Sequence, residues 1–148
     1  MLTQEDAEIL LKALKESLID FFSLPDNGKS SEFKVKSNSP VEVFAIYLYK
    51  GNMGRKQNIE ARISKNNVRL LALHINATNR HYNPPEFGGE LITGSHWHIY
   101  REGFDLKFAY PACDIFNDGF VENTLAFFKE FNIIKPPEIS TQLDFNLR

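Results

Sequence analysis

Residues 94–103 read GSHWHIYREG, and polar and apolar side chains alternate strictly through the middle of this stretch. Successive side chains of a β-strand point to opposite faces of its sheet. The pattern therefore predicts a strand that turns His96, His98 and Tyr100 to one face and buries the Trp and Ile between them. Three ring side chains that exchange protons or hydrogen bonds, gathered on one face, are typical of a functional site.

Segments on both sides of this stretch predict further strands. Residues 41–49 and 59–63 alternate in a similar way, and residues 68–76 form a longer, more apolar run. Residues 105–110 follow residues 96–100 across a short turn. β-Branched and aromatic residues are frequent in these segments, as they are in strands generally.

Two segments with helical spacing flank the predicted strands. Apolar residues recur every three or four positions over residues 4–23, and Thr3 is suited to cap the start of this helix. A second helix is expected to begin near residues 117–118 and to end before Pro136, because proline interrupts helical hydrogen bonding.

The order helix, five strands, helix predicts one α+β domain over residues 1–148. We expect an antiparallel sheet of about five strands, with an N-terminal and a C-terminal helix packed on one face. The other face of the sheet then stays open for a ligand.

The predicted open face is rich in side chains that carry chemistry. All four histidines of the chain lie within residues 74–98, and the long loop over residues 78–95 can add Arg80 and His81 to the face. The side chains expected on the face from the strands are Glu60, Arg62, His74, Asn76, His96, His98, Tyr100 and Lys107.

The composition is that of a protein with a hydrophobic core. Hydrophobic residues make up 43% of the 148, so no metal or disulfide should be needed for stability. Cys113 is the single cysteine; this excludes an intrachain disulfide and fits a reducing compartment, and we expect its thiol to be buried. The sequence has neither an apolar run of membrane-spanning length nor the pattern of a signal peptide. We therefore expect a cytoplasmic protein without membrane contact.

Charge is unevenly distributed, although the net charge is −2. Residues 29–107 contain twelve Lys and Arg against seven Asp and Glu, a charge of +5, whereas residues 1–28 carry −4 and residues 108–148 carry −3. A basic sheet between acidic ends favours a polyanionic partner, such as RNA or another phosphate-bearing ligand. A solvated surface of mixed charge is the alternative.

Our first functional hypothesis is a toxin-like endoribonuclease that cleaves RNA by acid–base catalysis, with no metal and no cofactor. Such cleavage needs a base for the 2′-hydroxyl, an acid for the leaving oxygen and cations for the phosphate. His96 and His98, or His74, are candidates for the proton transfers because imidazole titrates near neutral pH. Tyr100 would position the substrate. The other candidate substrate-binding residues are Arg62, Arg80, Asn76, Lys107 and Glu102.

Two other functions stay open. His96 and His98, with His74 from a neighbouring strand, offer three imidazoles that suit zinc, iron or manganese. Alternatively, the same cationic and aromatic face would bind a nucleotide, a nucleic-acid strand or an acidic protein without catalysis. Elemental analysis of the purified protein separates the metal site from the other two functions.

Three segments form a recognisable pattern: the Asn-containing strand over residues 73–76, the order His-x-His-Ile-Tyr-x-Glu-Gly within residues 96–103, and the aromatic-Ala-aromatic-Pro ending of residues 108–111. This pattern resembles an uncharacterised family of small bacterial and prophage proteins. The association of that family with mobile elements implies a toxin or a counter-defence protein, with an antitoxin or a host-defence protein as candidate partner. The resemblance favours His96, His98, Tyr100 and Glu102 as the residues to test. A homodimer is a further candidate assembly.

Overall fold

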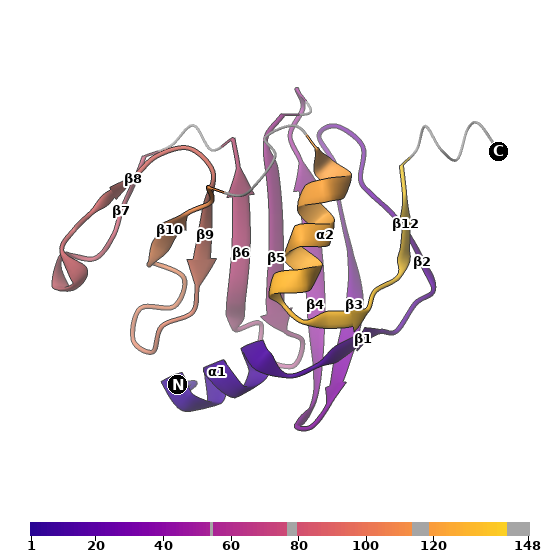
Figure 1. Ribbon diagram of the computed structural model, residues 1–148, viewed down its shortest axis with the longest axis horizontal. Helices are drawn as coiled ribbons and strands as arrows, with labels where there is room; N and C mark the ends of the chain where they lie inside the picture. The colour runs from indigo at the N-terminus through magenta and orange to yellow at the C-terminus, as the bar shows by residue number, and fades with distance from the viewer. Residues whose placement is uncertain (54, 77–79, 114–118, 142–148) are drawn as a thin grey trace.

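The computed structural model describes residues 1–53, 55–76, 80–113 and 119–141 (Figure 1). More of these residues lie in strands than in helices. In chain order the elements are α1 (Gln4–Lys12), β1 (Lys15–Ser17), β2 (Phe21–Ser23), β3 (Ser30–Asn38), β4 (Val41–Lys50), β5 (Gln57–Ile63), β6 (Arg69–Ile75), β7 (His81–Tyr82), the 3-10 helix η1 (Pro85–Phe87), β8 (Leu91–Ile92), β9 (His96–Ile99), β10 (Ala109–Pro111), α2 (Phe120–Glu130), β11 (Ile133–Lys135) and β12 (Glu138–Ser140).

Eight of the described strands form one sheet in the order β10-β9-β6-β5-β4-β3-β1-β11. Neighbours pair antiparallel except β1 and β11, which run parallel. β2 and β12 form a separate parallel pair, and β7 and β8 form a hairpin that lies beyond the β10 edge of the sheet (Figure 1). The sheet is therefore mixed, and both ends of the described chain contribute to it or to its neighbouring pair.

Helix α2 lies over one face of the sheet, across β4 and β5 (Figure 1). The side chains that alternate toward it form the core; Phe44, Ile46 and Leu48 of β4 are fully buried. On β9 the indole of Trp97 stacks on the ring of Phe127 in α2, with ring centroids 6.0 Å apart and planes 16° from parallel. Trp97 therefore faces the helices, as the alternation predicted.

The predicted fold class is wrong. The main sheet has eight strands rather than about five, it is mixed rather than antiparallel, and the described chain is mostly β rather than α+β. The largest error concerns residues 13–23, predicted as the second half of a long helix. These residues leave α1 at Ala13 and form β1 and β2, which pair with strands from later in the chain.

The misleading signal in residues 13–23 is the spacing of their apolar side chains. Leu14, Leu18 and Phe21 fit a helical period, yet they are 61%, 52% and 70% exposed, so they do not form a buried helix face. Backbone pairing with β3, β11 and β12 replaces the intrahelical hydrogen bonds here, and this tertiary context overrides a weak local preference.

The remaining predicted elements agree better with the structure. Strands β4, β5 and β6 lie within two residues of their predicted bounds, and β10 is shorter than predicted. The polar segment before Pro40 forms the full-length strand β3, because its inward side chains Phe33 and Val35 are buried while Lys34 and Lys36 are exposed. Helix α2 is present, and its predicted start near residues 117–118 lies outside the described residues.

Lys15 lies where the C-terminal ends of the two helices meet, and its side chain is fully buried. Its ammonium donates hydrogen bonds to the carbonyl oxygens of Leu11 at 3.2 Å, Ala13 at 2.8 Å and Phe131 at 2.8 Å. It also lies 3.8 Å from the centroid of the Phe131 ring. One cation thus satisfies carbonyl groups that both helices leave unpaired at their ends.

Two smaller findings concern helix length and the cysteine. Among the described residues, no helix combines the length and the hydropathy needed to cross a membrane. Cys113 is exposed, contrary to the expectation of a buried thiol, because it follows the end of β10 where the chain leaves the sheet edge.

Candidate functional site

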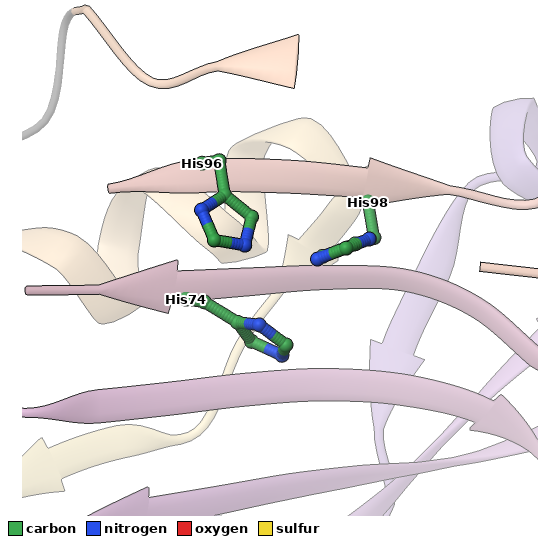
Figure 2. Close-up of side chains that lie close together, drawn as sticks. All are labelled: His74, His96 and His98. Carbon is green, nitrogen blue, oxygen red and sulfur yellow. The ribbon is translucent and has the colours of Figure 1, made fainter. Parts of the chain in front are cut away.

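Strand pairing brings three histidines together on the face of the sheet opposite α2 (Figure 2). His74 of β6 pairs directly with His96 of β9. His98 lies two residues further along β9, so its side chain is on the same face, and its strand partner is Ala72. The ring centroids lie 5.3 Å apart for His74 and His96, 4.8 Å for His74 and His98, and 4.7 Å for His96 and His98. We call these three residues the histidine cluster.

The histidine cluster has the dimensions of a metal site. Each ring offers one nitrogen such that the three nitrogens lie within 4.8 Å of one another. Zinc bonds of about 2.0–2.1 Å in tetrahedral geometry hold ligand nitrogens about 3.4 Å apart, so modest ring rotations would close the set around one ion. His96 and His98 are only 3% and 6% exposed, which removes most competing water from the site.

Backbone carbonyl groups orient two of these rings. The Nδ1 atom of His96 lies 2.8 Å from the carbonyl oxygen of Gly94, and Nδ1 of His98 lies 2.6 Å from that of Leu106. A carbonyl oxygen accepts hydrogen bonds, so Nδ1 carries the hydrogen in both rings and Nε2 keeps its lone pair. Metal-binding histidines are typically fixed through their second nitrogen in this way.

A fourth imidazole lies beside the histidine cluster. His81, from β7 of the hairpin, has its ring centroid 4.9 Å from that of His98 and 6.0 Å from that of His96. The sequence placed His81 in a long loop that could add to the face, and the structure brings it there. All four histidines of the chain therefore lie in one region of the structure, with His81 at the border of the histidine cluster.

The environment keeps the rings neutral at neutral pH. Burial lowers the pKa of His74 to about 4 and that of His98 to about 3, and the neighbouring imidazoles add to both shifts. Burial also lowers the pKa of His96, against the effect of its bond to the Gly94 carbonyl. Neutral imidazole is the form that binds a metal ion, whereas a general acid at neutral pH must hold a proton.

Comparison with known proteins gives one family match. Residues 2–133 match the family described as "Family of unknown function (DUF6978)". The chain belongs to this family. Searches of curated proteins and of solved structures each found no match to the chain. The match confirms that the chain belongs to an uncharacterised family, whereas the bacterial or prophage origin stays a prediction. The matched residues include every residue of the histidine cluster.

In this DUF6978 protein, two residues that the sequence predicted beside the histidines, Arg62 and Tyr100, interact with other partners. The Arg62 guanidinium lies 3.1 Å from the carboxylate of Glu32 on β3, so its charge is paired with an acid. The Tyr100 side chain is buried, and its hydroxyl donates to the carbonyl oxygen of Leu2 ahead of α1. Burial raises the pKa of this phenol. Tyr100 thus connects the end of β9 to the N-terminal segment.

The other predicted substrate-binding residues are dispersed. Asn76 donates through its side chain to the carbonyl oxygen of Arg55, and Glu102 exchanges hydrogen bonds with Gln4. Arg80 and Lys107 are exposed and flank the hairpin side of the site. Lys107 contributes a backbone group, because its carbonyl oxygen lies 2.7 Å from Nε2 of His81.

Sequence reasoning missed the residue that holds the hairpin. Asn83 follows β7 and is 3% exposed. Its side-chain amide donates to the carbonyl oxygen of Ala109 at 3.0 Å and accepts from the Ala109 N–H at 2.7 Å. The amide thereby takes the place of a neighbouring strand along β10. An asparagine between His81 and a Pro-Pro pair reads as an ordinary turn residue, so the sequence carries no signal for this role.

Proposed function

We propose that this protein binds a transition-metal ion, zinc in the first instance, through the histidine cluster of His74, His96 and His98. The observation that carries the proposal is that one nitrogen from each ring lies within 4.8 Å of the others. Three imidazoles form a ligand set that zinc, copper, nickel and iron accept.

Two further features support this function. The carbonyl groups of Gly94 and Leu106 leave Nε2 of His96 and His98 with a lone pair, as a metal ligand requires. The three rings come from two adjacent strands that are each paired on both sides, and ligands on rigid elements keep their geometry.

The acid–base ribonuclease stays a prediction and has less support. His74 and His98 have a pKa near 4 and 3, too low for an efficient general acid at neutral pH. Arg62, a candidate phosphate ligand, is paired with Glu32. Binding of a nucleotide or a protein partner without catalysis also stays a prediction, and neither RNA nor an antitoxin is needed for metal binding.

Metal binding is tested by titrating zinc into chelator-treated protein with isothermal calorimetry, followed by elemental analysis after dialysis. The wild type should bind one zinc ion per chain. Removing an outer-shell partner of a metal ligand costs roughly 10–100-fold in affinity. His98→Ala removes a direct ligand, so its zinc affinity should fall by at least that much.

Lys107→Ala is the matched control. Its side chain is exposed and its backbone carbonyl is retained, so zinc affinity should match that of the wild type. Wild-type protein that binds no zinc, copper, nickel or cobalt would rule the proposal out. If the wild type cleaves RNA in excess chelator and Lys107→Ala cleaves it more slowly, the ribonuclease hypothesis replaces it.

A further inference from the structure

His81 borders the histidine cluster, although the nitrogens that lie within 4.8 Å of one another are those of the other three rings. In a tetrahedral zinc site with bonds of about 2.0–2.1 Å, the centres of the imidazole rings lie about 5 Å apart. The three ring pairs of the histidine cluster lie 4.7–5.3 Å apart, and His81 lies 4.9 Å from His98 and 6.0 Å from His96. The fourth ring therefore lies at ligand spacing from His98 and farther than that from His96, so a rotation of the His81 ring would be needed to complete the set.

The hydrogen bond of His81 selects the nitrogen that is left to bind a metal. Nε2 lies 2.7 Å from the carbonyl oxygen of Lys107, so Nε2 carries the hydrogen and Nδ1 keeps its lone pair. The preceding residue, Leu106, holds His98 through its own carbonyl oxygen at 2.6 Å. Two consecutive peptide groups thus orient two rings, as outer-shell acceptors do around bound zinc.

The hairpin that carries His81 is anchored rather than loosely placed. Two residues beyond His81, the buried amide of Asn83 makes its paired hydrogen bonds to Ala109 of β10. Ala109 is the direct strand partner of His98, so the anchor lies beside one of the cluster's own residues. The position of the His81 ring is in this way tied to the sheet.

We propose that His81 is the fourth protein ligand, which makes the metal centre a closed site of four imidazoles. This inference rests on the proposed function, and it specifies the type of site. A catalytic zinc keeps one position open for water or substrate, whereas four protein ligands fill a tetrahedral ion. The centre would then stabilise the protein or report metal availability rather than activate water.

Cobalt(II) is the probe that tests this inference, because tetrahedral cobalt absorbs visible light far more strongly than five- or six-coordinate cobalt. Wild-type protein freed of metal should bind one equivalent of Co²⁺ and develop the intense tetrahedral band. His81→Ala should still bind one equivalent, but with an affinity lower by about tenfold or more and with the band shifted in wavelength, because a solvent molecule replaces one imidazole. Free imidazole added to His81→Ala should restore the wild-type band position.

Tyr82→Ala is the matched control, since Tyr82 lies next to His81 on β7 and is 63% exposed. It should keep the wild-type band and affinity. If His81→Ala binds Co²⁺ with the same band and affinity as the wild type, His81 is not a ligand and the three-histidine site stands alone. Absence of Co²⁺ binding by the wild type itself would instead overturn the proposed function.

Discussion

At the scale of single residues, Lys15 is the most unusual side chain outside the site. A lysine is almost never fully buried unless it is paired, and here the partners are three carbonyl oxygens rather than a carboxylate. The ammonium has three hydrogens, and each meets one of these acceptors. Lys15 therefore joins the ends of α1 and α2.

Replacing Lys15 with methionine tests this role. Lys15→Met keeps an apolar chain of similar length but leaves helix-end carbonyl groups in the core without a donor. The free energy of unfolding should fall by about 3 kcal/mol, from the cost of unsatisfied buried acceptors. Urea denaturation measures this, with Lys12→Met at the exposed end of α1 as control. Equal stability of the two variants would contradict the capping role.

The burial of Lys15 should also make the free energy of unfolding depend on pH. Burial lowers its pKa from 10.5 to about 7 in the folded protein. Between these values the unfolded chain holds a proton that the folded chain has released, so a rise in pH favours folding. The stability gap between wild type and Lys15→Met should widen from pH 7 to pH 10, by up to about 1 kcal/mol per pH unit. A gap that stays constant in urea denaturation at several pH values would argue against this shift.

The three residues of the histidine cluster could be predicted from the sequence. Alternation in residues 94–103 placed His96 and His98 on one face, and the apolar pattern of residues 68–76 added His74. Lys15 and Asn83 could not be predicted, because a lysine and an asparagine are expected at the surface. Their burial depends on carbonyl groups that only the folded chain brings near.

At the scale of elements, Asn83 makes the hydrogen bonds that attach the β7–β8 hairpin to the edge of the sheet, beside the contact of His81 with the Lys107 carbonyl. Its two strands have two residues each, and a pair of strands this short is marginally stable alone. The amide of Asn83 connects it to the edge strand β10 through both polar groups of Ala109. The hairpin also covers part of an edge that would otherwise be open to pairing.

Asn83→Leu should remove both hydrogen bonds to Ala109 while keeping a side chain of similar size. The Ala109 amide then loses its acceptor, so we expect its hydrogen exchange to speed up by about tenfold or more, corresponding to about 1.4 kcal/mol of lost protection. Exchange measured by NMR tests this. Leu91→Ala, on the exposed side of β8, should leave the Ala109 amide unchanged. Unchanged exchange in Asn83→Leu would show that other contacts hold the hairpin.

Central strands were more predictable than the elements at the chain ends. Strand β5 buries every second side chain, and β4 and β6 contain runs of buried apolar residues, so all three are visible in the sequence. Residues 13–23 were less predictable because β1 and β2 have three residues each, and β3 because alternation extends over only a few of its nine residues. Their structure comes from pairing partners rather than from local pattern.

At the scale of the whole molecule, the sheet joins distant parts of the chain. β1 pairs in parallel with β11, and β2 pairs in parallel with β12, so residues near the start lie beside residues beyond 132. A sequence read segment by segment cannot reveal such pairings, which is why the strand order and the mixed sheet were missed. The proposed metal site is non-local to a lesser degree, because its candidate ligands lie on β6, β7 and β9.

A metal held across these strands should stabilise the folded protein as a whole. Zinc at one hundred times its Kd adds about 2.7 kcal/mol to the free energy of unfolding if the unfolded chain does not bind it. For a chain of this size the Tm should rise by about 5–10 °C. Calorimetry with and without zinc measures the shift, and a variant with His74→Ala and His98→Ala should show none. An equal rise in that variant would indicate binding elsewhere.

The stacking of Trp97 on Phe127 gives the protein an intrinsic fluorophore at an informative position. Trp97 is the single tryptophan of the chain, and its immediate neighbours on β9 are His96 and His98, whose rings point to the opposite face. Its emission therefore reports the packing of α2, and a light-absorbing ion such as Cu²⁺ in the histidine cluster should quench it. Zinc, with a filled d shell, should leave it bright. The same strand lets the core and the site be followed in one unlabelled sample.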